Sequence, residues 1–495
     1  MVDKKRVCVI GAGVSGLAAA KAFAAKGHEI VILERGADLG GVWEASRRYP
    51  DVQTQSAKSM YRFTDAPMPE NYPEWPRGEQ VEAYLHDYAE RNNLRSRARF
   101  GANVEAMQRR PDGKPGWRLD ISGVGGAKTT EDYDFVAICT GQFSDKNVPD
   151  HPGVANFIVA GGQILHSSGY RDPAQLAGKR VIVLGGSKSA TDIAVSAVKA
   201  GALATTLVYR QPRWRVPYYI AGLVNFKFIV FMRAQEQLFR GWNLSPFAKT
   251  MQRLCKPLIW ANWRAFEAIL KLQLGLKKCD MVPEERIEDA VNCAFPVVTP
   301  DFYPMIRDGR IKAIRSAFAG YEPGAVSLSN GERVSADVAI LATGWRIGAP
   351  ILPQEFRDKL IDPDGQYRLY RFIANPDLPD MGFVGFNSSF ATLLTSEISA
   401  HWLVRYADGQ LARQPSADEM NRDIEMMRRY RRVERPAASV YNGLCVAPFH
   451  FRHLDELIAD MGASLRSRGL TERLLPLDAQ AFGRYLASMP EYAAG

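Results

Sequence analysis

The chain has 495 residues, of which 46% are hydrophobic and 24% are charged, and its formal net charge is +9 at pH 7. This length is too great for one hydrophobic core and predicts two or three domains. The basic residues are dispersed along the chain, which argues against a nucleic-acid partner and favours local sites for an anionic ligand. No apolar run is long enough to span a bilayer.

The cysteines and the N-terminal sequence narrow the possible classes of protein further. The six cysteines show neither a closely spaced pair nor ligand-like spacing with the seven histidines. We therefore expect no metal site, no disulfide framework and no redox dithiol. The opening MVDKKR and the apolar stretch after it imitate a secretory signal, but functional glycines, Lys21 and Lys26 interrupt that stretch. We expect a mature N-terminus and a cytoplasmic protein.

The chain opens with a strand, a glycine-rich turn and a helix. The turn reads Gly11-x-Gly13-x-x-Gly16, and it follows an apolar run rich in β-branched residues. These glycines suit a tight turn, the close approach of a pyrophosphate, and close packing of helix on strand. A second strand ends at Glu34, whose carboxylate is placed to accept hydrogen bonds from a ribose diol. The pattern predicts a complete βαβ unit for a dinucleotide.

The same architecture returns at Val181–Leu184. The turn after this strand reads GGSKSA, so small residues replace the second and third glycines, while its serines and lysine add donors for phosphate oxygens. The second strand of this unit is followed by Arg210, where the first unit has Glu34. Because an arginine at this place suits a ribose 2′-phosphate, the second site is predicted to bind NADPH.

Two dinucleotide units in one chain indicate hydride transfer from a nicotinamide to a flavin, with FAD in the opening unit. The run from Ala336 to Gly344 is a buried strand that ends in Thr-Gly, and it echoes an earlier strand that ends at Thr140-Gly141. We therefore predict an α/β fold with two Rossmann-like dinucleotide-binding domains, the NADPH domain being inserted into a discontinuous FAD domain. The expected boundaries are 1–174 and 336–495 for the FAD domain, with a helical C-terminal tail, and 175–335 for the NADPH domain.

Several motifs resemble one family. The linker from Gly162 to Tyr170 matches FxGxxxHSxxY, except that the leading Phe is Ala160, and GGVW at 40–43 and LATGW at 341–345 also match. The chain thus resembles the class B flavin-dependent monooxygenases of the flavin-containing monooxygenase type, whose relatives include N-hydroxylating and Baeyer–Villiger enzymes. The linker lacks the Trp-Pro that Baeyer–Villiger enzymes have after its histidine, which favours oxidation of a heteroatom.

The resemblance implies FAD, NADPH and O₂ as cofactors and a small organic molecule as substrate. In the implied mechanism NADPH reduces FAD, O₂ adds to flavin C4a, and the hydroperoxide passes one oxygen to an amine nitrogen or a sulfide sulfur. From the motifs and the resemblance together, the predicted cofactor-binding residues are Gly11, Gly13, Ser15, Gly16, Glu34, Arg35, Gly41, Val42, Trp43, Val104, Thr140, Gly141, Ser167, Gly185, Ser187, Lys188, Ser189, Asp192, Arg210, Thr343, Gly344 and Thr395.

Two residues are candidates for a catalytic role. Gln55 stands where the family usually presents an asparagine near the flavin, and His166 lies in the linker motif, where a structural role is an equal alternative. Two further functions remain open: a Baeyer–Villiger monooxygenase acting on a ketone, and a flavoprotein NADPH oxidase or reductase. A disulfide reductase would require a redox-active cysteine pair, which the spacing does not show.

An apolar and aromatic insertion, about 214–290, is the part least like the family. Within it, 216–232 is apolar but is interrupted by Asn225 and Lys227. We expect core packing here first; a peripheral membrane contact, a substrate entrance and a homodimer contact are the alternatives.

Overall fold

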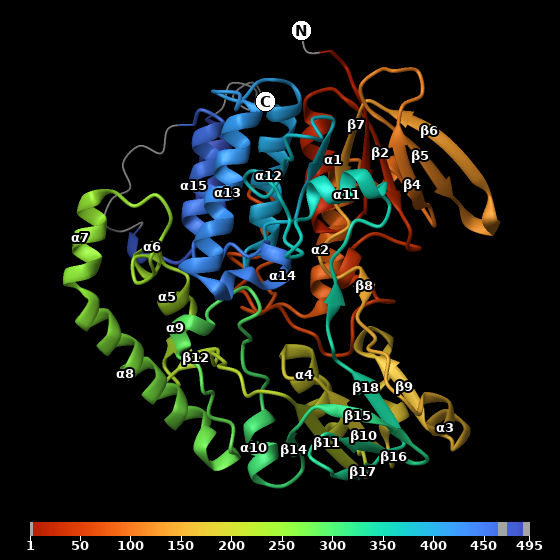
Figure 1. Ribbon diagram of the computed structural model, residues 1–495, viewed down its shortest axis with the longest axis vertical. Helices are drawn as coiled ribbons and strands as arrows, with labels where there is room; N and C mark the ends of the chain where they lie inside the picture. Colours follow the sequence, from red (N-terminus) through yellow and green to blue (C-terminus); the bar gives the residue numbers. More distant parts are fainter. Residues whose placement is uncertain (1–2, 464–472, 489–495) are drawn as a thin grey trace.

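Two parallel sheets of five strands form the centres of two α/β units, which lie one above the other in Figure 1. The computed structural model describes residues 3–463 and 473–488. The rest of the predicted tail, 464–472 and 489–495, lies outside the described residues. The predicted fold class is confirmed.

The first sheet has the strand order β20-β7-β1-β2-β3. Its strands are β1 (Arg6–Ile10), β2 (Glu29–Glu34), β3 (Ala98–Phe100), β7 (Phe135–Ile138) and β20 (Met381–Phe383). All four residues of β7 are buried, as expected for a central parallel strand covered on both faces. Helix α1 (Val14–Ala25) connects β1 to β2 and packs against α12 (Thr392–Ala407).

The second sheet has the order β14-β11-β10-β18-β9. Its strands are β9 (Gln163–His166), β10 (Arg180–Leu184), β11 (Ala204–Tyr209), β14 (Lys312–Arg315) and β18 (Val338–Leu341). Two of them, β9 and β18, lie outside the range 175–335 expected for this unit. The sheet therefore extends from Gln163 to Leu341, because the linker strand β9 pairs in parallel with β18.

Smaller sheets complete both units. Antiparallel strands β4 (Asn103–Arg109), β5 (Trp117–Ser122) and β6 (Lys128–Tyr133) form one sheet, and β15 (Phe318–Glu322), β16 (Ala325–Leu328) and β17 (Arg333–Ser335) form another. Two short pairs are β12 (Tyr219–Ile220) with β13 (Val224–Asn225), and β8 (Asp145–Lys146) with β19 (Trp345–Arg346). The last pair joins the two linker segments through which the chain passes from one unit to the other.

The remaining helices lie around the sheets, and several of them, from the middle and the end of the chain, build the left side of the molecule in Figure 1. They are α2 (Gly78–Arg91), α3 (Val154–Val159), α4 (Lys188–Lys199), α5 (Lys227–Val230), α6 (Arg233–Glu236), α7 (Pro246–Leu254), α8 (Lys256–Leu274), α9 (Ile287–Ala290), α10 (Phe302–Arg307), α11 (Gln354–Leu360), α13 (Ala417–Val433), α14 (Val440–Gly443), α15 (His450–Asp460) and α17 (Ala479–Ala487). Among the described residues, no helix is both long enough and apolar enough to cross a membrane.

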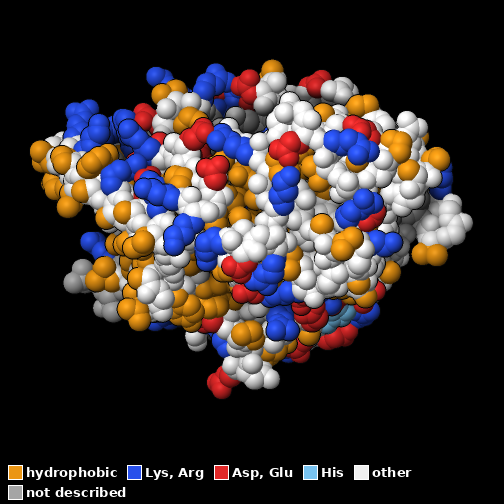
Figure 2. Space-filling model, turned by 90° about the horizontal axis from the view of Figure 1, so that it is seen from below, with side chains coloured by type: hydrophobic (Ala, Val, Ile, Leu, Met, Phe, Trp, Pro, Cys, Tyr) orange, Lys and Arg blue, Asp and Glu red, His pale blue; other side chains and the backbone are white. Residues whose placement is uncertain are grey.

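The insertion contains the most exposed apolar surface. The 216–232 segment is only partly core: Ile220, Phe226 and Phe231 are buried, whereas Leu223 and Phe228 are exposed. Helices α7 and α8 carry the larger exposed set: Phe247, Met251, Leu254, Leu258, Trp260, Ile269 and Leu272. Figure 2 shows hydrophobic side chains next to Lys and Arg at the left edge, the side on which these helices lie in Figure 1.

Candidate functional site

The two glycine turns are built alike. The N–H of Gly11 donates to Leu33 O at 2.8 Å, and the N–H of Gly185 donates to Val208 O at 2.9 Å. Both glycines have positive φ, +108° and +146°. A Cβ on Gly11 would collide with Cys139 O, just after β7, and a Cβ on Gly185 would collide with Ala342 O, just after β18. These two strands pair with β1 and β10, the strands that lead into the turns. Each unit therefore requires glycine at this place, which supports the repeat read from the sequence.

The other glycines of the first turn have different neighbours. A Cβ at Gly16 would overlap with Gly11 O, so this glycine is what lets α1 pack against the turn. A Cβ at Gly13 would lie 3.4 Å from Gly41 Cα, which places the turn directly beside the GGVW segment. Gly13 and Gly41 therefore bring two backbone segments together at the start of α1.

Both helices that follow the turns begin without a side-chain cap. Helix α1 starts after Gly13 and α4 after Ser187, and neither has an acidic residue in its first turn. By contrast, Ser416 caps α13 by accepting a hydrogen bond from the N–H of Glu419. Uncapped N–H groups and the helix dipole suit an anion, so both helix starts fit the phosphates of a dinucleotide.

Glu34 lies buried at the end of β2, beside the first turn. One carboxylate oxygen accepts the N–H of Ala12 at 2.7 Å and the other accepts the N–H of Gly36 at 2.7 Å. Each oxygen retains a further acceptor position, so the carboxylate can fasten the turn and still bind a ribose diol. The neighbouring Arg35 is exposed and donates to Ser144 O at 2.7 Å.

Other residues predicted for the first site are divided between the turn and the core. Trp43 is buried and donates from its indole N–H to the Tyr61 hydroxyl at 2.9 Å, whereas Val42 is exposed. Val104 is buried in β4. Thr140 and Gly141 follow β7 and are partly exposed.

Ser15 and Thr395 form hydrogen bonds at the start of two packed helices. The Ser15 hydroxyl pairs with that of Ser396 at 3.1 Å and so joins α1 to α12. Thr395 is fully buried and donates to Ala391 O in its own first turn at 3.2 Å. Their observed contacts hold the helices that surround the first turn.

In the second unit, Asp192 on α4 is the centre of a polar network. It accepts a hydrogen bond from the Tyr49 hydroxyl at 2.8 Å, one from the Thr299 hydroxyl at 2.5 Å, and one from the Lys188 ammonium. Burial and the Asp192 carboxylate raise the pKa of Tyr49 well above its usual value. Because Tyr49 belongs to the first unit, the network links the two units beside the second turn.

Two arginines flank the second turn. Arg210 follows β11 directly and is exposed, as a partner for a 2′-phosphate must be. Arg215 is buried, donates to Gly186 O at 2.6 Å and lies over the Phe302 ring at 5.5 Å. The sequence did not distinguish Arg215 from the exposed Arg213, since both stand in the same polar-aromatic run. Ser187 and Ser189 flank Lys188 at the start of α4.

His166 joins the linker that contains it to the linker that follows β18. Its Nδ1 accepts the N–H of Ser168 at 3.2 Å, so the proton is on Nε2, which donates to Gly344 O at 3.1 Å. Burial lowers the pKa of His166, and the ring packs edge-on against Trp345. Thr343 donates to Asn147 O at 2.5 Å, and Ser167 is buried beside the histidine. Both ring nitrogens of His166 therefore hold backbone in place.

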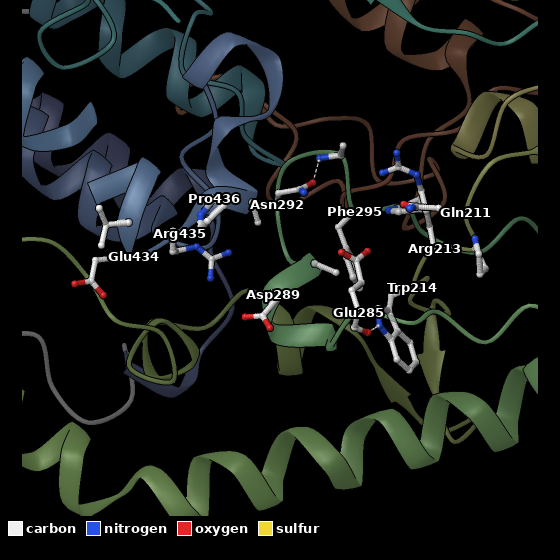
Figure 3. A pocket seen from close by; sticks show the side chains of 16 residues that line it. Gln211, Arg213, Trp214, Glu285, Asp289, Asn292, Phe295, Glu434, Arg435 and Pro436 are labelled. Carbon is white, nitrogen blue, oxygen red and sulfur yellow. Dashed lines mark hydrogen bonds between the residues drawn. The ribbon is translucent and has the colours of Figure 1, made fainter. Parts of the chain in front are cut away.

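A cavity of about 610 Å³ opens between the end of β11, the segment after α9 and the end of α13. Figure 3 shows Arg435 and Pro436 on one side and Gln211, Arg213 and Trp214 on the other. Its other lining residues are Pro212, Glu285, Asp289, Ala290, Asn292, Ala294, Phe295, Pro296, Val433, Glu434 and Ala437. This pairing of distant segments could not be read from the sequence.

Gln55, from the first unit, contacts a residue that is adjacent in sequence to the lining of this cavity. Its side-chain oxygen accepts the N–H of Val297 at 3.0 Å, and Val297 follows the lining residue Pro296. The amide N–H₂ of Gln55 keeps its donors for another partner. The predicted site residues thus lie in the two turns and the helices after them, in the linkers, in buried positions such as Val104, and, for Gln55, next to the cavity.

Comparison with known proteins identifies the family. The family model "Flavin-binding monooxygenase-like" matches residues 4–464. The "Probable flavin-containing monooxygenase 1" of Arabidopsis thaliana is 32% identical, over 97% of this chain and 96% of its own. Flavin-containing monooxygenase 5 of Mus musculus is 27% identical, over 86% of this chain and 78% of its own.

Solved structures share the fold. S-allyl-L-cysteine S-oxygenase from Allium sativum has a TM-score of 0.63 at 19% identity, covering 96% of this chain and 91% of its own. ε-Caprolactone-bound cyclohexanone monooxygenase has a TM-score of 0.68 at 16% identity, covering 93% of this chain and 98% of its own. OTEMO in complex with FAD and NADP has a TM-score of 0.64 at 17% identity, covering 86% of this chain and 90% of its own. With these matches in sequence and fold, the chain belongs to the flavin-binding monooxygenase-like family and is a flavin-dependent monooxygenase.

Proposed function

We propose that this monooxygenase binds FAD in the first unit and NADPH in the second, and transfers one oxygen atom of O₂ to a nitrogen or sulfur centre of a small organic substrate. The observation that carries the proposal is the pair of equivalent turns, each leading into a helix without a side-chain cap. A cavity also lies between the units, and Gln55 contacts Val297 next to its lining residue Pro296. FAD, once reduced by NADPH, would supply the activation of O₂.

The residues of the first unit fit FAD by their chemistry. The N-terminus of α1 offers free N–H groups to a pyrophosphate, and Glu34 keeps acceptor positions for a ribose diol. Gly13 and Gly41 leave no side chain between the turn and the GGVW segment. We assign this unit the binding and orientation of the flavin nucleotide.

The residues of the second unit fit NADPH. Arg210 is exposed at the strand end, where it can form a charge-assisted hydrogen bond with a 2′-phosphate. The buried charge of Arg215 lies behind the turn and favours an anion in front of it. Asp192 and Lys188 neutralise one another, so we assign them the positioning of α4 against the first unit.

At the junction of the units, Gln55 and His166 have different roles in this proposal. Gln55 is held by the N–H of Val297. Its remaining amide donors would bind a nucleotide and help to exclude water from the reacting atoms. His166 is a positioning residue, since both of its nitrogens are engaged with backbone.

Oxidation of a heteroatom is favoured over Baeyer–Villiger oxidation by the linker sequence. Where Baeyer–Villiger enzymes continue with Trp-Pro, this chain has Tyr170, which is buried and hydrogen-bonded to Ser196 on α4 at 2.8 Å. The solved relatives named above include an S-oxygenase and cyclohexanone monooxygenase, so the fold alone does not separate the two reactions. Ketone oxidation remains the second candidate.

A paired substrate assay tests the proposal. Methyl phenyl sulfide and cyclohexanone are offered separately, while NADPH consumption, oxygen uptake and peroxide release are recorded together. We expect sulfoxide formation with one NADPH and one O₂ used per product. Lactone formation without sulfoxide would support the second candidate. Peroxide as the only product with both compounds would indicate an oxidase.

Contacts of this enzyme with a membrane surface or with a second copy stay predictions, as does the cytoplasmic location. Such a contact would use the exposed side chains of Leu223 and Phe228 together with the exposed apolar side chains of α7 and α8. Basic residues beside that face, such as Lys249 and Arg253, would favour an anionic surface.

A further inference from the structure

Two cysteines that are 152 residues apart in the sequence lie in contact beside the cavity. The backbone N–H of Cys293 donates to the Sγ of Cys445 at 3.1 Å. Cys293 is partly exposed, and its neighbours Asn292 and Ala294 both line the cavity. The absence of a close cysteine pair in the sequence therefore does not exclude a pair in the fold.

Ser388 fixes the geometry of both cysteines. Its N–H donates to Leu444 O at 2.7 Å and its carbonyl accepts the N–H of Val446 at 3.1 Å, so it pairs in parallel with the segment that contains Cys445. The same carbonyl accepts the thiol of Cys293 at 2.8 Å. One residue thus holds the two thiols against each other.

The distance permits a covalent bond. Disulfides join Cα atoms that are about 4.4–6.8 Å apart. The Cα–N bond of Cys293, the 3.1 Å contact and the Cα–Sγ distance within Cys445 add up to about 7.4 Å if the atoms are in line. Because the chain of atoms bends at the N–H donor, the two Cα atoms lie closer than this, near the upper end of the range that a disulfide spans. No large movement of the backbone is needed.

The surroundings of the two cysteines change the pKa values of their thiols in opposite directions. Burial by itself would raise the pKa of Cys445, but the hydrogen bonds from the side chain and the N–H of Cys293, together with the charge of Arg435, bring it below its usual value. Burial raises the pKa of Cys293. A thiol of lowered pKa beside a second thiol is the arrangement found in peroxide-sensitive cysteines.

We propose that Cys293 and Cys445 are a modification site, a dithiol that hydrogen peroxide converts to a disulfide at the cavity wall. The thiolate sulfur attacks one oxygen of the peroxide, the O–O bond breaks, and the hydroxide that leaves takes up a proton as water. The second sulfur then attacks the sulfenic acid and displaces its oxygen as another water. In total two thiols are oxidised and one hydrogen peroxide is reduced to two waters. The bond ties the segment after α9 to the segment before α15.

The experiment is peptide mapping of the full-length enzyme before and after hydrogen peroxide, with thiols counted in denaturant. We expect the six free thiols to fall to four, the peptides of Cys293 and Cys445 to be joined with the loss of two hydrogen atoms, and dithiothreitol to restore six. Irreversible sulfinic or sulfonic acid at either residue without the linked peptide would overturn the proposal, as would an unchanged thiol count.

Three variants make the assignment specific. Cys293→Ser keeps a donor for Ser388 O and should fold, yet it should form no linked peptide; Cys445→Ser should form none either. Cys255→Ser, which removes the other partly exposed cysteine, should leave the link intact. If Cys293→Ser still loses two thiols to a disulfide, another pair is responsible and the proposal is wrong. The readout needs no turnover, so its failure leaves the proposed monooxygenation untouched.

Discussion

In the proposed function, the choice between NADPH and NADH depends on Arg210. It is exposed at the end of β11, and a hydrogen bond to a charged group contributes about 1.5–3 kcal/mol. Arg210→Ala should therefore raise the Michaelis constant for NADPH by about ten- to a hundredfold and leave that for NADH nearly unchanged. Steady-state kinetics with both cofactors measure this difference.

Arg315 provides the matched control for this measurement. It ends the neighbouring strand β14, opposite Tyr209, and it is exposed like Arg210. Arg315→Ala should alter the kinetics with NADPH and NADH alike, if at all. An equal loss with both cofactors in Arg210→Ala would show that Arg210 supports the fold and not the 2′-phosphate.

A second residue-scale prediction compares the two turns. A Cβ at Gly16 would overlap with Gly11 O, whereas the corresponding place in the second unit already carries a methyl group, at Ala190. Gly16→Ala should lower the melting temperature and the retention of flavin, because α1 must move away from the turn. Ala190→Gly should change both far less. Equal effects of the two substitutions would contradict the packing role assigned to Gly16.

How far the sequence predicted the site differs from residue to residue. Gly11, Gly16 and Gly185 were predictable, because a tight turn leaves no space for a side chain. The roles of Arg215 and of the cavity-lining Arg435 were not, since burial of an arginine depends on segments that are distant in sequence.

At the scale of elements, α12 and α15 bury several titratable side chains. His453 on α15 is buried and accepts a hydrogen bond from Asn387 at 2.8 Å, and burial lowers its pKa to about 3. The unfolded chain, with a pKa near 6.5 at this residue, binds the proton first as the pH falls. Neutral His453 thus contributes stability that is present above pH 6.5 and is lost as the pH falls from there toward 3.

The variant His453→Gln tests this contribution. A glutamine oxygen can still accept from Asn387 but takes up no proton, so the variant should lose less stability on acidification, by about 1.4 kcal/mol per pH unit below pH 6. Melting temperatures of both proteins at pH 7 and pH 5 give the comparison. A parallel decline in the two proteins would mean that His453 is not held neutral in the fold.

The strands also show where the residue range expected for the second domain differs from the range of the second sheet. The repeat of strand, turn and helix at 181–200 is a local pattern, and the sequence revealed it. The pairing of β9 with β18 is a contact between residues 163–166 and 338–341, which no local pattern encodes. The linker motif was thus recognised from the sequence, but its membership of the second sheet was not.

At the scale of the whole molecule, the account requires the two units to act on one reaction. The Asp192 network, the β8–β19 pair and the contact of Gln55 with Val297 each join one unit to the other. The two turns were predicted from the sequence, whereas these joints were not, because they depend on how the units pack. The proposed function therefore implies that oxidised nicotinamide would stay in the second unit after the flavin is reduced and would help to exclude water from the reacting atoms.

Stopped-flow mixing with O₂ tests that claim most directly. Enzyme reduced with NADPH should give a transient spectrum that belongs to neither reduced nor oxidised flavin, and it should release peroxide slowly. Enzyme reduced with dithionite in the absence of NADP⁺ should lose the transient faster and release more peroxide. Return to oxidised flavin in one phase under both conditions, with peroxide formed in equal amount to the flavin, would contradict the account.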